Sequence, residues 1–209
     1  AFTPIPGSPE RFLAGYQVGG KQAYTEYRGK MTLREELAMK LTAFTHAAID
    51  PSKNIILTPG TQGALFLAIG SMAARGDKVA IVEPDYFANR KLAEFFECTP
   101  VPIPMDYFHA KDGSGIDLTY LEERFREGIR LFLFTNPNNP TGAVYSSEEI
   151  HAIAKLAKKY HVSLIVDELY SRQIFDERDY THLCALADLP EEMVTIIGPS
   201  KTESLSGFR

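Results

Sequence analysis

Two hydrophobic periodicities alternate along the chain, one typical of amphipathic helices and the other of strands. From residue 32 to 49 apolar side chains recur at every third or fourth position, and Thr32 with Glu35 has the spacing of a helix capping box. Later segments repeat the helical pattern, and short apolar runs between them predict strands. The later helices are expected over residues 61–75, 86–97, 118–128 and 147–160, and the strands over residues 54–58, 78–82, 99–103, 130–135, 162–166 and 194–197.

The order of these elements predicts an α/β fold. Strands that alternate with helices form a mostly parallel sheet, and helices cover such a sheet on both faces. The last predicted helix has a clear start signal, because Ser146 or Ser147 precedes Glu149 with the spacing of a capping box.

The domain organisation is expected to be simple. Residues 1–23, rich in proline and glycine, are expected to form an N-terminal loop with at most a short helix over 9–17. Residues 24–209 show no internal repeat and no linker, and are expected to form one domain. Because the chain stops at Arg209 without a turn or a cap, we expect a piece of a longer polypeptide, with a smaller second domain missing.

Composition narrows the classes of function. A net charge of −5, with no window rich in lysine and arginine, argues against a nucleic-acid-binding surface. No apolar run approaches the roughly 20 residues that a membrane helix needs, and the N-terminus lacks a signal sequence, so a cytoplasmic protein is expected. Cys98 and Cys184 are far apart without a CxxC pair, so we expect neither a disulfide framework nor a metal site.

Candidate chemistry follows the predicted strands, because parallel sheets bind ligands beyond the carboxyl ends of their strands. The turn over residues 58–64 contains two glycines and leads into a helix, where free backbone N–H groups favour a phosphate. Taken alone, this segment is explained better by a tight turn with an N-cap threonine. Tyr86 follows the strand over 78–82 and could stack on a flat ligand, although ordinary packing also explains a single aromatic side chain.

Three later segments are more specific. Residues 136–142 contain three asparagines and two prolines, which form a stiff loop with side-chain amides in fixed directions. Asp167 directly follows a buried strand, although it could simply cap the next turn. Residues 200–209 present Lys201 after an apolar strand and a Gly-Pro turn, at the position where α/β sheets hold functional side chains.

In combination these segments resemble the signature motifs of the pyridoxal-phosphate-dependent aminotransferases of fold type I, class I/II. Residues 136–142, 167–170 and 200–209 carry the resemblance, and it covers about residues 24 to 209, which correspond to the large domain of that family. The resemblance implies pyridoxal 5′-phosphate as the cofactor. It implies transfer of an amino group between an L-amino acid and a 2-oxo acid.

The resemblance also implies a role for each matching residue. Lys201 would form a Schiff base with the cofactor aldehyde and move the proton at the substrate Cα. Asp167 would pair with the ring nitrogen, so that the ring can accept electrons, and Tyr86 would stack on the ring as a third catalytic candidate. The other cofactor contacts would be Gly60, Thr61, Gln62 and Arg209 at the phosphate, Ser200 as a nearby hydroxyl, and Asn139 and Tyr170 at the ring 3-oxygen.

Two further features concern the phosphate. Tyr24 resembles the tyrosine that reaches the phosphate of the neighbouring subunit, which implies a homodimer. Gly198 departs from the family pattern, because many members have a serine three residues before the lysine. We therefore expect Ser200 or another hydroxyl to replace that serine.

Other functions remain open, because a fold does not determine a reaction. A pyridoxal-phosphate-dependent lyase or decarboxylase is one alternative, and a non-catalytic regulator that senses the cofactor or an amino acid is another. In the resembling family the arginine that binds the substrate carboxylate comes from a later small domain, and no arginine here is an obvious replacement. We therefore expect residues 1–209 alone to be poorly soluble and inactive, and a chain with roughly 150 to 200 more residues to form an active dimer.

Overall fold

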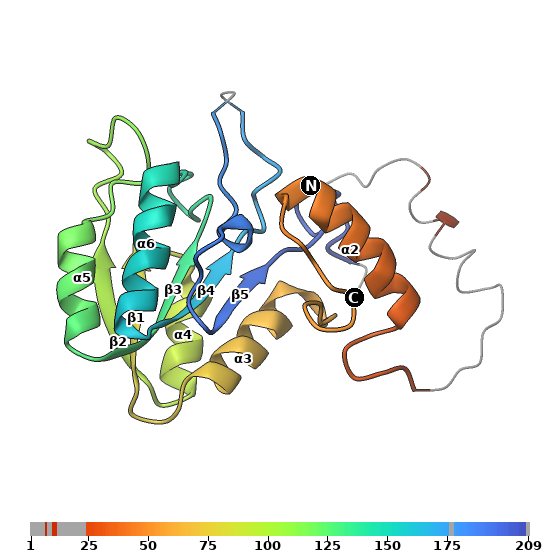
Figure 1. Cartoon of the computed structure of the whole chain (residues 1–209), viewed down its shortest axis with the longest axis horizontal. Helices are drawn as coiled ribbons and strands as arrows, with labels where there is room; N and C mark the ends of the chain where they lie inside the picture. Colours follow the sequence, from red (N-terminus) through yellow and green to blue (C-terminus); the bar gives the residue numbers. More distant parts are fainter. Residues whose placement is uncertain (1–6, 8–9, 12–23, 176–177, 208–209) are drawn as a thin grey trace.

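Five parallel strands form the centre of the chain in the computed structural model, which describes residues 7, 10–11, 24–175 and 178–207 (Figure 1). The strands lie in the order β2-β1-β3-β4-β5, and each pairs in parallel with its neighbours. After β2 the chain returns past β1 to form β3, so the direction of winding reverses between β1 and β3. The strands are β1 (Lys78–Glu83), β2 (Thr99–Pro104), β3 (Ile129–Thr135), β4 (Ser163–Asp167) and β5 (Met193–Ile196).

Helices cover both faces of the sheet. On one face α3 (Gly60–Met72) and α4 (Phe87–Phe95) pack on a core that includes Val79 and Ile81. On the other face α5 (Leu118–Arg126), α6 (Ser147–Tyr160) and the short 3-10 helix η1 (Leu183–Ala185) pack on a second core. The second core takes alternate strand residues such as Ala80 and Val82, as the period of two in a strand requires. The predicted α/β fold is therefore confirmed.

Burial explains which strands occupy the middle. All five residues of β4 are buried, and in β3 only Arg130 is not fully buried, so both strands are enclosed by helices on each side. The edge strand β2 contains three prolines in the sequence TPVPIP, which an edge tolerates because it leaves one row of backbone donors unpaired. The sheet therefore places its most apolar strands, β3 and β4, next to each other at the centre.

Two predictions about local structure are wrong. Thr32 does not cap a helix: α2 (Met31–Thr45) begins one residue earlier, and the Glu26 carboxylate accepts a hydrogen bond from the Met31 N–H at 3.2 Å. Residues 54–58 are extended but form no strand in the described part of the chain, because the Leu57 N–H bonds to the Arg28 carbonyl at 3.0 Å instead of to a sheet. A short apolar run such as residues 54–58 looks the same in the sequence whether it pairs in a sheet or lies outside it.

The remaining element predictions hold within a few residues. Of the two alternatives for the start of α6, Ser146 is the cap: it accepts from the Glu149 N–H, and Glu149 accepts in return from the Ser146 N–H. The predicted N-terminal loop and its possible helix over 9–17 lie almost entirely outside the described residues. The helix α2 lies at the side of the sheet, where the Phe44 ring contacts the His182 ring at 4.7 Å between centroids (Figure 1).

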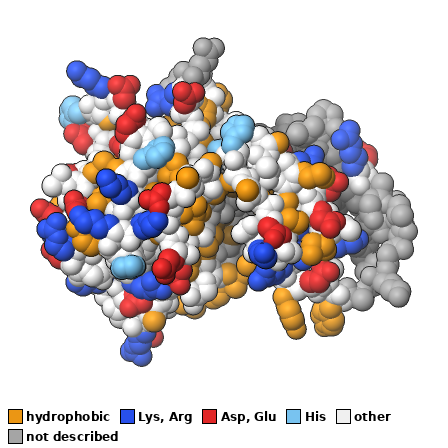
Figure 2. Space-filling model, in the orientation of Figure 1, with side chains coloured by type: hydrophobic (Ala, Val, Ile, Leu, Met, Phe, Trp, Pro, Cys, Tyr) orange, Lys and Arg blue, Asp and Glu red, His pale blue; other side chains and the backbone are white. Residues whose placement is uncertain are grey.

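The surface carries mixed charge. On the face shown in Figure 2, lysine and arginine side chains lie among aspartate and glutamate side chains rather than in one basic patch. No helix among the described residues is long and apolar enough to cross a membrane. Within that part of the chain, no three His, Cys, Asp or Glu side chains are grouped so that they could hold a metal ion, and Cys98 and Cys184 are free thiols.

Candidate active site

Buried polar side chains gather at the carboxyl edge of the sheet, which is the edge that the sequence predicts for a ligand. Most buried residues of the protein are apolar, so a polar group of this size needs local hydrogen-bond partners or a ligand. The side chains come from the ends of β3, β4 and β5 and the loops after them. They belong to Thr135, Asn136, Asn138, Asp167, Glu168 and Ser200.

Asp167 is the last residue of β4, and only 6% of its surface is exposed. One carboxylate oxygen accepts a hydrogen bond from the Leu169 N–H at 3.0 Å, so Asp167 caps the following turn as well as facing the edge. Burial raises the pKa of Asp167 to about 6, against the effect of that hydrogen bond, and the charge of Glu168 adds to the rise. A cation placed next to this carboxylate would stabilise its charged form.

Tyr170 lies near Asp167, and Tyr86 lies near Tyr170. Burial raises the pKa of Tyr170, and the charge of Asp167 and the nearby Tyr86 add to the rise. The Tyr86 hydroxyl is 3.5 Å from the Gln62 side-chain oxygen, at the outer limit of a hydrogen bond. The structure thus brings four predicted site residues together from α3, β4 and the segments after β1 and β4.

The start of α3 approaches the end of β5. Gly60 has a left-handed backbone, with φ at 75°, and its N–H donates to the Thr58 carbonyl at 2.7 Å. No side chain caps the helix, so the next N–H groups of the first turn of α3 can bind an anion. A Cβ atom at Gly198 would lie 3.0 Å from the Thr61 methyl carbon and 3.5 Å from Leu169 Cδ1. The serine expected at position 198 is therefore hindered by the Thr61 methyl group, which explains the glycine there.

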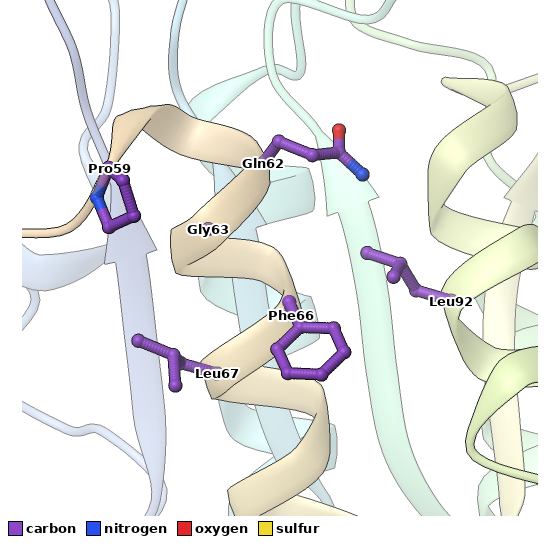
Figure 3. A pocket seen from close by; sticks show the side chains of 6 residues that line it. All are labelled: Pro59, Gln62, Gly63, Phe66, Leu67 and Leu92. Carbon is purple, nitrogen blue, oxygen red and sulfur yellow. The ribbon is translucent and has the colours of Figure 1, made fainter. Parts of the chain in front are cut away.

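An open groove lies beside the start of α3 (Figure 3). It has a volume of about 450 Å³ and lies between α3 and α4. Gln62 reaches over its upper end from the first turn of α3, next to the edge described above. The rest of the lining is mainly apolar, and the lining residues are Pro59, Gln62, Gly63, Phe66, Leu67 and Leu92.

Lys201 follows β5 after a short turn. The backbone of this segment folds around the Pro199 carbonyl, which accepts from the Glu203 N–H at 3.2 Å and from the Leu205 N–H at 3.4 Å. Ser200 is buried and Lys201 is half-buried, so the lysine is neither enclosed in the core nor fully solvated. Because β5 pairs with β4 and places Ile196 beside Asp167, Lys201 belongs to the same edge as Asp167.

Asp85 is a residue that sequence reasoning missed. It follows β1, and its carboxylate accepts hydrogen bonds from Thr135, Tyr86 and Asn89. Burial raises its pKa to about 7 against these hydrogen bonds, and the charge of Asp167 adds to the rise. The sequence contains a signal for it, because Asp85 lies just after β1 and Asp167 ends β4, but the sequence-based prediction for this segment rests on the neighbouring Tyr86 alone.

A second missed group supports the residue after Asp167. The buried Glu168 carboxylate lies 2.5 Å from His182 Nδ1 and also accepts from the Leu183 N–H at 3.3 Å. The nearby Tyr180 hydroxyl donates to the Asn136 carbonyl at 2.7 Å. The segment around residue 182 is thereby tied to the ends of β3 and β4, a connection that no local sequence pattern indicates.

Two predicted site residues stay predictions. Tyr24 is fully exposed, as a residue that contacts another subunit would be in a single chain, and its predicted role stays a prediction. Arg209 lies outside the described residues. Asn139 is half-buried in the loop after β3, and its N–H donates to the Thr135 hydroxyl at 3.1 Å.

The residues at this edge fit pyridoxal phosphate on three counts. The uncapped start of α3 suits a phosphate, the Tyr86 ring suits a flat heterocycle, and the buried Asp167 suits a cationic ring nitrogen. Without a cation, Asp167 bears a burial penalty that its hydrogen bond does not remove. The edge can therefore hold an anionic group at one end and a protonated ring nitrogen at the other.

Known proteins similar to this chain are aminotransferases. The sequence pattern of the family described as aminotransferase class I and II matches residues 16–209. The chain is 33% identical over 190 residues to the probable aspartate aminotransferase of Methanocaldococcus jannaschii, covering 91% of this chain and 48% of that protein. It is 28% identical over 193 residues to human kynurenine–oxoglutarate transaminase 1, covering 89% of this chain and 46% of that protein.

A solved structure is more similar still. An aspartate aminotransferase from Rhodobacter sphaeroides is 58% identical and has a TM-score of 0.94, over 99% of this chain and 53% of that one. The chain thus spans about half the length of the relatives that it matches.

Proposed function

The chain belongs to the class I and II aminotransferases, and from this premise we propose that it forms the cofactor-binding part of a pyridoxal-phosphate-dependent aminotransferase. The reaction would transfer an amino group between an L-amino acid and a 2-oxo acid. The observation that carries the proposal is the position of Asp167, a buried carboxylate at the end of a central strand, near Tyr170, which in turn lies near Tyr86. The relatives named above are aminotransferases, so a lyase, a decarboxylase and a sensory regulator are less favoured.

Binding of the cofactor phosphate is assigned to the start of α3. Its free N–H groups and the positive end of the helix dipole attract an anion, and Thr61 and Gln62 add side-chain donors. Ser200 would supply the hydroxyl that Gly198 lacks. Arg209 is proposed as the bidentate partner of the phosphate.

The ring is proposed to lie between Tyr86 and the carboxyl end of β4. Bound there, pyridoxal phosphate supplies a conjugated ring that accepts the electron pair left when the substrate Cα–H bond breaks. Asp167 holds a proton on the ring nitrogen, while Asn139 and Tyr170 bind the 3-oxygen. Tyr86 covers one face of the ring and excludes water from it.

Proton transfer is assigned to Lys201. Its Nζ would take the proton from the substrate Cα as a general base and would later return a proton as a general acid. Its place on the loop after β5, beside the strand that ends in Asp167, supports this role. We also propose a cytoplasmic homodimer in which Tyr24 reaches the site of the neighbouring subunit.

The substrate class is tested first with the amino acids that the relatives suggest. The protein from Rhodobacter sphaeroides is an aspartate aminotransferase, so L-aspartate is the first amino donor to test, followed by L-kynurenine. Each is added singly to the full-length protein with pyridoxal phosphate, and the change in cofactor absorbance is recorded. A donor that the enzyme accepts converts the cofactor in a single turnover without an added 2-oxo acid.

Covalent trapping tests the assignment of Lys201. Borohydride reduction followed by mass spectrometry of the peptides is expected to find the cofactor on Lys201. Lys201→Ala should remove this label and the turnover, whereas Lys91→Ala, which changes an exposed lysine on α4, should retain both. A label on any other lysine would contradict the proposal.

A further inference from the structure

The Asp85 carboxylate bridges the start of α4 and the end of β3. One oxygen accepts from the Tyr86 N–H at 2.5 Å, from Asn89 Nδ2 at 3.1 Å and from the Thr135 hydroxyl at 2.7 Å. The other oxygen accepts from the Thr135 N–H at 3.0 Å. All four partners are donors, so this position needs a side chain that only accepts on both of its oxygens.

An isosteric amide cannot satisfy the same partners. If asparagine replaced Asp85, its NH₂ group would face either the Thr135 N–H or the donors of Tyr86, Asn89 and Thr135. Both orientations put two donors within hydrogen-bond distance of each other. The carboxylate is thus required by the geometry, although burial and the neighbouring Asp167 raise its pKa.

The Thr135 hydroxyl links Asp85 to the loop that follows β3. It has one proton and two lone pairs, and its proton goes to Asp85. Both lone pairs then face donors, because the hydroxyl accepts from the Asn139 N–H at 3.1 Å and from Asn138 Nδ2 at 3.3 Å. Asn138 Nδ2 also donates to the Pro84 carbonyl at 3.1 Å, which joins the two loops directly.

We propose that Asp85 is a positioning residue that orients Tyr86 directly and Asn139 through Thr135, so that both are set to contact the cofactor ring. This inference rests on the proposed function, because Tyr86 and Asn139 are cofactor contacts only under it. Thr135 is also the partner of Asp167 in the pairing of β3 with β4. The network therefore adjoins three proposed ring contacts, which are Tyr86, Asn139 and Asp167. Asp85 itself contacts none of the reacting atoms.

The matched control is Glu149. Its carboxylate also accepts from four donors, which are the Ser114 N–H and hydroxyl, the Gly115 N–H and the Ser146 N–H. This second network fixes a loop and the start of α6, and it includes none of the proposed cofactor contacts. Glu149→Gln therefore measures the general effect of disturbing such a network.

The experiment measures the dissociation constant of pyridoxal phosphate by absorbance titration of the full-length protein and its variants. Asp85→Asn should raise the constant about tenfold relative to Glu149→Gln, the size expected when a charge-assisted hydrogen bond is lost. Thr135→Val should raise it by a similar factor, whereas Thr135→Ser, which keeps the hydroxyl, should stay within about twofold of the wild type. In the double variant Asp85→Asn, Thr135→Val the dissociation constant should rise about tenfold rather than about a hundredfold, because both changes break the same chain of hydrogen bonds from Asp85 through Thr135 to Asn139.

Three results would overturn the inference. Constants within about twofold of the Glu149→Gln control for both Asp85→Asn and Thr135→Val would show that the network does not position the cofactor contacts. An additive loss in the double variant would show that Asp85 does not act through Thr135. If Asp85→Asn does not fold, equal constants for Thr135→Val and Thr135→Ser would overturn the role of the hydroxyl. A wild-type protein that does not bind pyridoxal phosphate would instead overturn the proposed function, and this inference with it.

Discussion

Asp85 and Asp167 are both buried carboxylates at the carboxyl edge, and burial raises the pKa of each. Asp167 could be predicted from the sequence, since a carboxylate directly after a buried apolar strand is unusual. Asp85 has a similar position but stands beside a more conspicuous tyrosine. Its role depends on Thr135, fifty residues later in the chain, and no local pattern connects two residues at that separation.

Charge removal at Asp167 is expected to stabilise the cofactor-free protein in a pH-dependent way. The pKa of Asp167 is raised from 3.8 to about 6 in the folded state. The folded state therefore holds the proton more tightly than the unfolded state, and stability falls as the pH rises from about 4 to about 6. Asp167→Asn should raise the free energy of unfolding by roughly 3 kcal/mol at pH 8 and by little near pH 4.

Urea unfolding of the cofactor-free protein at both pH values measures this effect, with Asp112→Asn as an exposed control. If Asp167→Asn raised the free energy of unfolding equally at both pH values, the burial of a charged carboxylate would not be the cause of the stabilisation. The same substitution should lower the transamination rate by several orders of magnitude, because the ring nitrogen loses the group that keeps it protonated. A variant that is more stable but less active is expected where a buried charge is kept for function at a cost in stability.

Helix boundaries show how far local signals determine an element. Two segments have the spacing of a capping box, but only Ser146 forms one, because α2 begins at Met31 and Thr32 therefore lies inside the helix, while Glu26 accepts from the Met31 N–H. Periodicity predicted where most helices and strands lie. It did not predict the unpaired extended segment over residues 54–58, since pairing depends on the rest of the sheet.

The two capping signals give a direct comparison of stability. Ser146→Ala should lower the free energy of unfolding by about 1 kcal/mol, because it removes the acceptor of the Glu149 N–H. Thr32→Ala should change it by less than about 0.5 kcal/mol, because Thr32 makes no capping bond and is exposed. Chemical denaturation of both variants measures the difference, and equal losses would show that the observed cap does not stabilise α6.

The approach of β5 to α3 gives a second test at the level of elements. Gly198→Ser places a Cβ atom 3.0 Å from the Thr61 methyl group, so we expect a loss of about 1 kcal/mol of stability and weaker cofactor binding. Thr61→Ser removes that methyl group and keeps the hydroxyl, so it should reverse the loss in the double variant. Thermal unfolding and cofactor titration of the single and double variants decide this, and a double variant no better than Gly198→Ser would contradict the steric explanation.

The sheet as a whole makes the site from segments that are distant in sequence. The alternating pattern of the chain predicted a parallel sheet with helices on both faces, and the candidate residue Asp167 lies at the carboxyl edge where such sheets bind ligands. The pattern did not predict the strand order. That order places β1 between β2 and β3, which brings Asp85 and Tyr86 next to the loop after β3.

Cofactor binding is expected to stabilise the whole molecule, because the folded state alone assembles the site. Pyridoxal phosphate at about a hundred times its dissociation constant should add about 2.7 kcal/mol to the free energy of unfolding of the full-length protein. The shift in the melting temperature should shrink in Lys201→Ala at the same cofactor concentration, since the covalent attachment is lost. A shift of the same size in both proteins would mean that Lys201 contributes nothing to binding.

The position of β1 inside the sheet has a consequence for synthesis of the protein on the ribosome. Both neighbours of β1 follow it in the sequence, and β3 ends more than 50 residues after β1 begins. At a translation rate of roughly 5 to 20 residues per second, a nascent chain leaves the edge of β1 that faces β3 unpaired for several seconds, even if β2 has already paired with the other edge. Gly60 and Lys201 are separated by about 140 residues, so the site remains open for roughly 7 to 28 seconds of elongation. Nascent chains of this protein are therefore expected to bind chaperones until β3 has been synthesised, and to bind the cofactor only after the segment around residue 201 has emerged.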